Sequence, residues 1–187
     1  MRSERGFTMI ELLIYSMLAT VVLVIVGGML INALNAQNTV RDATDASNTG
    51  QLVSQSVTHG VRHARALDLD APTAGSEVLR ALVVDDAVTT PVVAHCEAWY
   101  FGGGEIRTTR SDTQIPLPLN PADVSDWTLL ADGALPVGTA PVFAISGLTA
   151  DLRVQLDSGK GLPVLIETTA ASRQPNVLPS GVESLCF

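Results

Sequence analysis

The feature that most constrains this chain is an uncharged, apolar segment close to its amino terminus. The segment runs for twenty residues, Leu12 to Ile31, and its interruptions are Tyr15, Ser16, Thr20 and the pair Gly27-Gly28. A helix of about 20 mainly apolar residues is long enough to span the hydrocarbon core of a bilayer. The sequence therefore predicts a membrane-spanning helix followed by a separate domain.

Charged residues around this segment predict its orientation. Arg2 and Arg5 precede it together with Glu4, whereas the first basic residue after it is Arg41. Basic residues concentrate on the cytoplasmic side of membrane helices, so the amino terminus is predicted to be cytoplasmic. Everything after about Asn35 would then be exported, which predicts a single-pass protein of the cytoplasmic membrane.

A cleaved signal peptide and a plain signal anchor are the alternatives for this segment. A signal peptide has a shorter apolar core of about 7–15 residues and an A-x-A-like cleavage site. The nearby Ala33-Leu34-Asn35-Ala36 spaces its alanines wrongly for such a site. A signal anchor accounts for the length but leaves Gly6 and Glu11 without a role.

The junction Arg5-Gly6-Phe7-Thr8-Met9-Ile10-Glu11, which leads directly into the apolar segment, resembles the processing site of type IV prepilin-like proteins. In that family a membrane peptidase cuts after the glycine and methylates the new amino terminus. The resemblance implies a cleaved leader at residues 1–6, cleavage between Gly6 and Phe7, and N-methylation of Phe7. It also implies a filament subunit and not an enzyme.

Glu11 is a carboxylate at the edge of an apolar segment. An acidic residue costs up to about 2.5–3.5 kcal/mol at the centre of a membrane helix, which marks it as a functional candidate. The resemblance implies an assembly role, in which Glu11 neutralises the amino terminus of a neighbouring subunit. The alternative is that the side chain reaches back to water at the headgroups.

The resemblance is specific over residues 4–34 and architectural beyond them. It implies a structural subunit of a type IV pilus or a type II secretion pseudopilus. The implied partners are other pilin or pseudopilin subunits, prepilin peptidase, the inner-membrane assembly platform and, before assembly, the lipid bilayer. The size of the domain and Trp99 favour a minor or tip-proximal subunit. A signal-anchored exported binding or enzymatic domain that is not cut at Gly6 is the alternative function.

The charge of the chain gives no sign of nucleic-acid binding. The formal net charge is −8, and residues 1–6 contain two arginines and one glutamate, so the processed product would carry −9. Nucleic-acid-binding domains usually cluster Lys and Arg on one face. The balance in this chain is acidic.

After the apolar segment the pattern is that of an amphipathic helix. Small and apolar residues recur at spacings of three and four, as on one face of a helix: Val40, Ala43, Ala46, Gly50, Val53, Val57, Val61 and Ala64. We predict that the helix continues to about Leu67. The predicted segments are a membrane or filament-core helix at 7–34, the amphipathic half of the stem at 35–68, and an exported β-sheet domain at 69–187.

Strand-like patterns follow a predicted loop at Leu67–Ser76. They occur at Val78–Val84, His95–Phe101, Glu105–Arg110, Val142–Ile145, Leu152–Leu156 and Val164–Thr169. Gly102-Gly103-Gly104 is a typical hairpin turn between two of them. Gln114–Ala140 is interpreted as a long surface loop or as a short strand with irregular flanks, and Trp127–Leu130 is its candidate strand. The predicted fold class is α+β, a long amino-terminal helix whose amphipathic half packs on an antiparallel β-meander, as in pilins.

Gly27 and Gly28 lie inside the predicted membrane helix. Each glycine costs a helix about 1 kcal/mol relative to alanine. One hypothesis is that the pair gives the helix flexibility, so that it loosens when the subunit leaves the bilayer. The other is close helix packing through small residues.

Cys96 and Cys186 are the two cysteines of the chain. Export to an oxidising compartment would favour a disulfide between them, and the resemblance supports a disulfide near the end of the chain. Two buried free thiols are the alternative.

Metal and catalytic patterns are weak. His59 and His63 are four residues apart on a predicted helix but lack the glutamate of a zinc-protease motif. Asp85-Asp86 and the acidic residues between Asp123 and Asp132 show no ordered calcium-ligand spacing. We therefore expect no metal, no cofactor and no catalytic residues.

Overall fold

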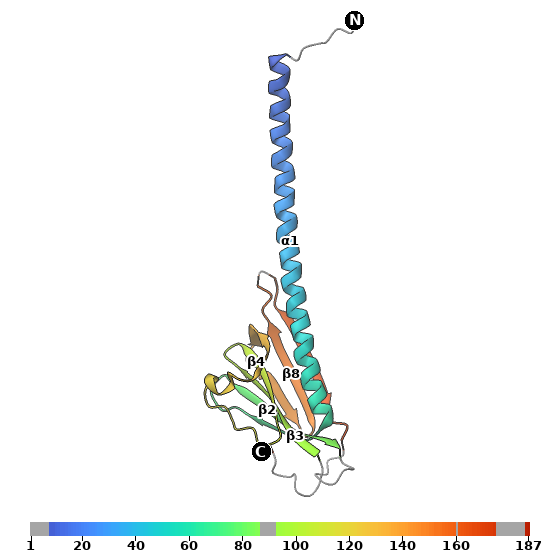
Figure 1. Ribbon diagram of the computed structural model, residues 1–187, viewed down its shortest axis with the longest axis vertical. Helices are drawn as coiled ribbons and strands as arrows, with labels where there is room; N and C mark the ends of the chain where they lie inside the picture. The colour runs from blue at the N-terminus through green and yellow to red at the C-terminus, as the bar shows by residue number, and fades with distance from the viewer. Residues whose placement is uncertain (1–7, 87–92, 160, 175–185) are drawn as a thin grey trace. The chain divides into compact units, whose positions relative to one another are not determined.

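The computed structural model describes residues 8–86, 93–159, 161–174 and 186–187 (Figure 1). The chain divides into two compact units, Met1–Arg41 and Asp42–Phe187. A single helix, α1, spans Met9–His63, so that it begins in the first unit and ends in the second. The predicted long amino-terminal helix is confirmed.

The end of α1 differs from the prediction. The helix stops at His63, and Ala64–Asp70 form strand β1, so the predicted continuation to about Leu67 is wrong. Leu67 and Leu69 pack against the core while Asp68 and Asp70 bind Arg80 on the neighbouring strand. This alternation has the period of two that is typical of strands. Its burial pattern decides the structure of the residues after His63, although the spacing of three and four that is typical of helices continues to Ala64.

The first sheet is an antiparallel meander in the order β1-β2-β3-β4-β5. After β1, its strands are β2 Glu77–Asp86, β3 Val93–Gly102, β4 Glu105–Ser111 and β5 Thr128–Asp132. The predicted hairpin is confirmed, because Gly102 pairs with Glu105 and Gly103-Gly104 form the turn between β3 and β4.

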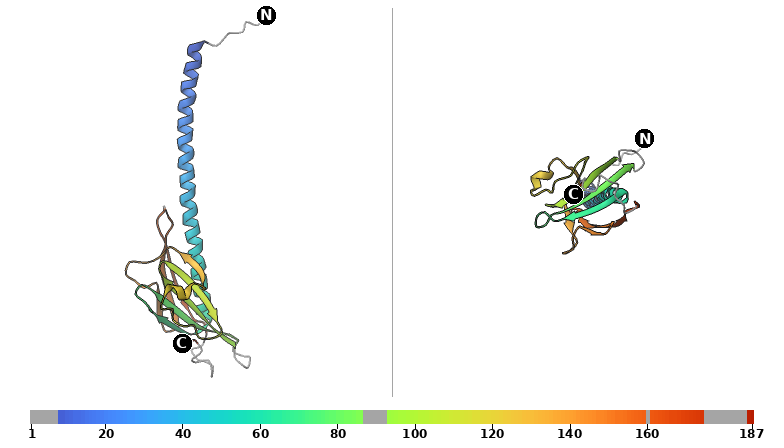
Figure 2. Two further views of the ribbon diagram at one scale, coloured as in Figure 1. Left: turned by 60° about the vertical axis from the view of Figure 1, so that its left-hand side comes forward. Right: turned by 90° about the horizontal axis from the view of Figure 1, so that it is seen from below.

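The remaining strands form a second antiparallel sheet, which the prediction of one meander did not include. Its strands are β6 Ala134–Pro136, β7 Phe143–Ser146, β8 Thr149–Leu156 and β9 Val164–Ala171. β9 pairs with β8 along its whole length, whereas β6 and β7 pair with the two halves of β8. The second unit is therefore a helix end packed on two sheets, as the views in Figure 2 show.

The main core joins the second half of α1 to both sheets. Within it, α1 buries Ala46, Val53, Val57 and Val61, so the predicted packing face is correct from Ala46 onward, whereas Val40 is 66% exposed.

Two glycines in α1 allow the sheets to come close. A Cβ at Gly60 would lie 2.2 Å from Trp99 Cη2, and one at Gly50 would lie 2.4 Å from Ile166 Cδ1. Gly50 belongs to the predicted packing face and Gly60 does not. Both are buried in the structure.

A second core covers the opposite face of the first sheet. It contains Val78, Leu82, Cys96, Ala98, Tyr100, Ile115, Val124 and Cys186. Ile115 and Val124 come from the segment 114–140, which also contains β5, β6 and a 3-10 helix at Pro121–Val124. The interpretation of this segment as a surface loop is therefore wrong, whereas the alternative of a short strand with irregular flanks agrees with β5, which overlaps Trp127–Leu130.

Arg107 holds this covering segment in place. Its side chain donates to Glu105, at 2.6 Å, and to the backbone carbonyl oxygens of Ser125, at 3.3 Å, and Trp127, at 3.1 Å. The fork of donors on a guanidinium suits several acceptors at once.

Candidate functional site

The first candidate site is the amino-terminal end of α1. Thr8 precedes the helix, and its carbonyl oxygen accepts hydrogen bonds from the backbone N–H groups of Glu11, at 3.1 Å, and Leu12, at 3.2 Å. The Thr8 side-chain oxygen lies 3.4 Å from the Glu11 nitrogen and 3.5 Å from Glu11 Oε2. Thr8 thus acts as an N-cap residue, because it accepts hydrogen bonds from backbone N–H groups of the first turn that have no partner within the helix.

This geometry brings Glu11 together with Thr8, a partner that the sequence analysis missed. The signal was present in the sequence, because Thr8-Met9-Ile10-Glu11 has the T-x-x-E spacing of a capping box. A carboxylate in the first turn also interacts favourably with the partial positive charge of a helix amino terminus. Gly6 and Phe7 lie outside the described residues.

Two polar side chains in the apolar part of α1 hydrogen-bond to the backbone of the helix itself. Ser16 Oγ donates to the carbonyl oxygen of Leu13, at 2.9 Å, and Thr20 Oγ1 donates to that of Ser16, at 2.8 Å. In a bilayer every polar group must find a partner within the protein. Within the described residues, α1 is long and apolar enough to cross a membrane.

Gly27 and Gly28 are both helical and lie in open surroundings. A Cβ at either position would meet no atom of the described residues within 4 Å beyond the helix's own neighbouring backbone. Nothing in the fold of the chain itself therefore requires glycine at these two positions. This contrasts with Gly60, further along the same helix.

The two cysteines form a disulfide. Cys96 on β3 and Cys186 have a Cα–Cα distance of 5.5 Å across a sequence separation of 90, and both are buried. The bond fixes the end of the chain beside the first sheet, where the Phe187 ring lies 5.6 Å from the guanidinium carbon of Arg80. The predicted Cys96–Cys186 pairing is confirmed.

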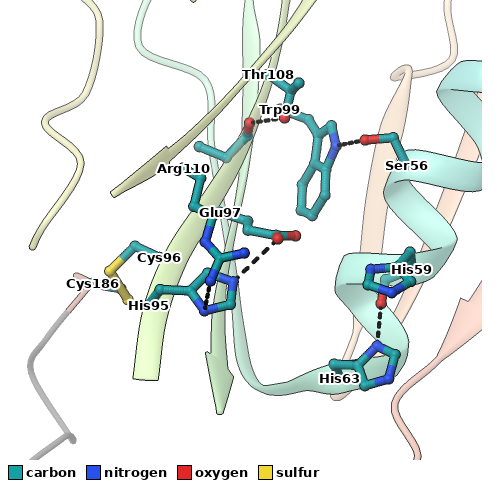
Figure 3. Close-up of polar contacts among 11 residues, drawn as sticks. Ser56, His59, His63, His95, Cys96, Glu97, Trp99, Thr108, Arg110 and Cys186 are labelled. Atoms are coloured by element: carbon teal, nitrogen blue, oxygen red, sulfur yellow. Dashed lines mark hydrogen bonds and ion pairs between the residues drawn. A yellow bond between two sulfur atoms is a disulfide. The ribbon is translucent and has the colours of Figure 1, made fainter. Parts of the chain in front are cut away.

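A polar network lies beside this disulfide, on β3 and β4 (Figure 3). His95 is buried, and its Nδ1 lies 3.1 Å from Arg110 Nη2 while its Nε2 lies 3.2 Å from Glu97 Oε1. A guanidinium only donates, so His95 Nδ1 is the acceptor and Nε2–H donates to Glu97. The histidine thus bridges a cation and an anion as a neutral ring.

A further polar contact in Figure 3 ties the helix to the first sheet. The indole N–H of Trp99 donates to Ser56 Oγ at 2.9 Å. This is how a buried tryptophan usually satisfies its single donor. The role of Trp99 in the structure is to bind α1 to β3.

The metal candidates of the sequence have structural uses. Asp123 accepts from the backbone N–H groups of Leu119 and Asn120, and Asp132 accepts from that of Gly133. The imidazoles of His59 and His63 lie side by side with centroids 4.6 Å apart, and His63 Nδ1 lies 2.8 Å from the His59 carbonyl oxygen. Within the described ranges, no three His, Cys, Asp or Glu side chains gather as metal ligands. The side chains of Asp85 and Asp86 lie outside the description.

Comparison with known proteins gives one match, at the amino-terminal end. The prokaryotic N-terminal methylation motif matches residues 1–27, which include Gly6, Phe7, Glu11 and most of the apolar segment. The chain matches no curated protein and no solved structure. The motif implies a type IV pilin-like protein that prepilin peptidase processes. Residues 1–27 of this chain thus form the cleavage and methylation motif of type IV prepilin-like proteins.

Proposed function

We propose that this chain is a structural subunit of a type IV pilus or type II secretion pseudopilus, and that it takes a minor or tip-proximal place there. Prepilin peptidase cuts it between Gly6 and Phe7, and Phe7 becomes the methylated amino terminus. The observation that carries the proposal is the methylation motif at residues 1–27. The long apolar helix that follows directly supports it, because such a helix can lie in a bilayer and later in a filament.

The proposed route begins in the cytoplasmic membrane, with the amino terminus in the cytoplasm and the domain exported. The subunit then enters the filament through α1, with help from the inner-membrane assembly platform and other subunits. Glu11 neutralises the amino terminus of a neighbouring subunit in this proposal. The disulfide between Cys96 and Cys186 supports export, because disulfides persist in oxidising compartments.

Gly27 and Gly28 are proposed to give α1 local flexibility during transfer from bilayer to filament. The open space around both positions supports a role outside the fold of the single chain. Replacement of both by alanine should reduce incorporation into filaments while leaving the membrane level of the protein unchanged. Unchanged incorporation would contradict the proposal and leave helix packing as the alternative.

The decisive experiment is the mass of the amino-terminal peptide of protein recovered from its native membranes and surface filaments. A peptide that begins at Phe7 with one added methyl group is the expected result. A Gly6→Ala variant is the control, and it should retain residues 1–6. A peptide that begins at Met1, or beyond Asn35, in the unaltered protein would overturn the proposal in favour of an anchored exported domain.

A further inference from the structure

The second unit contains a pocket whose titratable lining residues are all basic. It has a volume of about 670 Å³ and lies where the last turns of α1 meet the residues after β9. The residues that matter for the argument are Thr58, His59, Arg62, His63, Arg173 and Gln174. We call this site the basic pocket.

Backbone contacts fix the two arginines of the basic pocket next to each other. The N–H of Arg173 donates to the carbonyl oxygen of Arg62 at 3.0 Å. One residue earlier, Ser172 Oγ donates to the carbonyl oxygen of Ala64 at 2.6 Å. The two guanidinium groups therefore extend from neighbouring, fixed points of the main chain.

The charge of the basic pocket contrasts with that of the chain, which is −8 overall. Elsewhere, Arg80, Arg107 and Arg153 each form an ion pair with a carboxylate. Arg62 and Arg173 form no ion pair with any residue that the structure describes, and the described residues that line the pocket include no carboxylate. Two arginines thus line one pocket without an ion-pair partner among the described residues.

The histidines add to the same surface. His63 Nδ1 faces a carbonyl oxygen, which only accepts, so this nitrogen carries the proton and donates to His59. The other ring nitrogen of this tautomer is an acceptor, so His63 supplies no further donor to the pocket. His59 lies beside it, with 4.6 Å between ring centroids (Figure 3).

Stabilisation of the helix end accounts for only part of this arrangement. Cations in the last turn of a helix interact favourably with the carbonyl groups there, which would explain Arg62 and His63. Arg173 is not part of α1 but follows strand β9, and its backbone N–H already satisfies the carbonyl oxygen of Arg62 in the last turn. Two arginines from separate elements in one pocket lining form a candidate anion site.

We propose that the basic pocket binds the phosphate group of a small phosphorylated ligand. Guanidinium groups match phosphate oxygens in bidentate geometry, and two of them with the Thr58 hydroxyl offer more donors than the two oxygens of a carboxylate accept. The volume exceeds that of a bare phosphate and falls in the range of about 300–1,000 Å³ that is usual for small-molecule sites. The pocket therefore holds the phosphate and part of the group that carries it. This inference goes beyond the filament function and does not depend on it.

The test is calorimetric titration of the full chain in an uncharged maltoside detergent at constant ionic strength. The probes are inorganic phosphate and glycerol 3-phosphate. Both should bind saturably. The variant R62Q/R173Q should bind at least about tenfold more weakly, which corresponds to a loss of about 1.4 kcal/mol in binding free energy. The control R41Q/R153Q loses the same charge outside the pocket and should stay within about twofold of the unaltered protein.

Absence of saturable binding, or equal weakening in the control variant, would overturn the proposal. The variant R62K/R173K keeps the positive charge but loses the bidentate donors of the guanidinium groups. It should therefore bind with intermediate affinity. If R62Q/R173Q has an altered unfolding midpoint, this lysine variant decides the result. A short-chain phosphatidic acid distinguishes the source of the phosphate: tighter binding than glycerol 3-phosphate identifies a lipid headgroup, and equal binding identifies a soluble phosphomonoester.

Discussion

The carboxylate of Glu77, in β2, accepts a hydrogen bond of 2.7 Å from the backbone N–H of Phe143, in β7. The other oxygen of the same carboxylate accepts from the N–H of Val142 at 3.0 Å. One side chain of the first sheet thus satisfies two backbone donors at the start of a strand in the second sheet. Glu77 therefore fixes how the two sheets meet.

Replacement of Glu77 by glutamine should destabilise the protein. A glutamine has one acceptor oxygen, so its NH2 group would face the second backbone N–H and leave a donor without a partner. The expected loss is about 1–3 kcal/mol in the free energy of unfolding, measured by urea denaturation of the full chain in detergent. Glu167→Gln is the matched control, because its pair with Arg153 is exposed, and it should change stability by less than about 1 kcal/mol. Equal losses in the two variants would contradict this role of Glu77.

Gly60→Ala should be destabilising although alanine is the better helix former. The new methyl group would lie 2.2 Å from Trp99 Cη2 and 2.4 Å from Glu97 Oε2, so the helix must move away from β3. Overpacking of this kind costs about 1–3 kcal/mol, which outweighs the gain of about 1 kcal/mol in helix propensity. Gly27→Ala, on the same helix but in open surroundings, is the control. The measurement is the thermal unfolding midpoint of each variant relative to the unaltered protein. A higher midpoint for Gly60→Ala would refute the prediction.

Loss of the disulfide should weaken the second unit. The variant C96S/C186S opens a loop with a sequence separation of 90, and removal of a native disulfide costs about 2–5 kcal/mol. The same change frees Phe187 from its place over Arg80. The measurement is urea denaturation with and without a reducing agent. Reductant should lower the stability of the unaltered protein to that of C96S/C186S and leave the variant unchanged.

Stability should fall at alkaline pH through Tyr100. Burial raises the pKa of the Tyr100 phenol, and the nearby charge of Glu105 raises this pKa further. Above the ordinary tyrosine pKa of about 10 the unfolded chain has lost the phenol proton while the folded chain retains it, so stability decreases as pH rises. Below that pH the contribution is fully present. Tyr100→Phe should remove this part of the pH dependence, as measured by unfolding at a series of pH values. A persistent alkaline loss in the variant would assign it to other groups.

Thr8 and Glu11 allow capping to be separated from charge. Glu11→Gln can still cap the helix but carries no charge, whereas Thr8→Ala removes the capping hydroxyl and keeps the carboxylate. If Glu11 neutralises a neighbouring amino terminus, Glu11→Gln should lower incorporation into filaments more than Thr8→Ala does. The measurement is the ratio of filament to membrane protein for each variant. A larger loss in Thr8→Ala would show that capping is the more important role.

Local sequence is sufficient to predict the amino-terminal part of this protein. The apolar run Leu12–Ile31 and the junction around Gly6 act through local composition, and no packing partner is needed to interpret them. The hairpin around Gly103 was also predictable, because turn geometry depends on a few adjacent residues. Glu11 was found through its charge, but its contact with Thr8 was overlooked although the T-x-x-E spacing was present.

The organisation of the second unit depends on contacts between distant segments of the chain. Ala64 fits both a helical stripe and a strand, and pairing with Val83 on β2 resolves it in favour of a strand. The composition of the residues around Val124 predicts a polar loop, whereas in the structure Val124 belongs to the second core, which covers one face of the first sheet. The basic pocket depends on a contact between Arg62 and Arg173, which are far apart in sequence. Such long-range contacts depend on the mutual burial of distant segments, and no local pattern encodes which segments will meet.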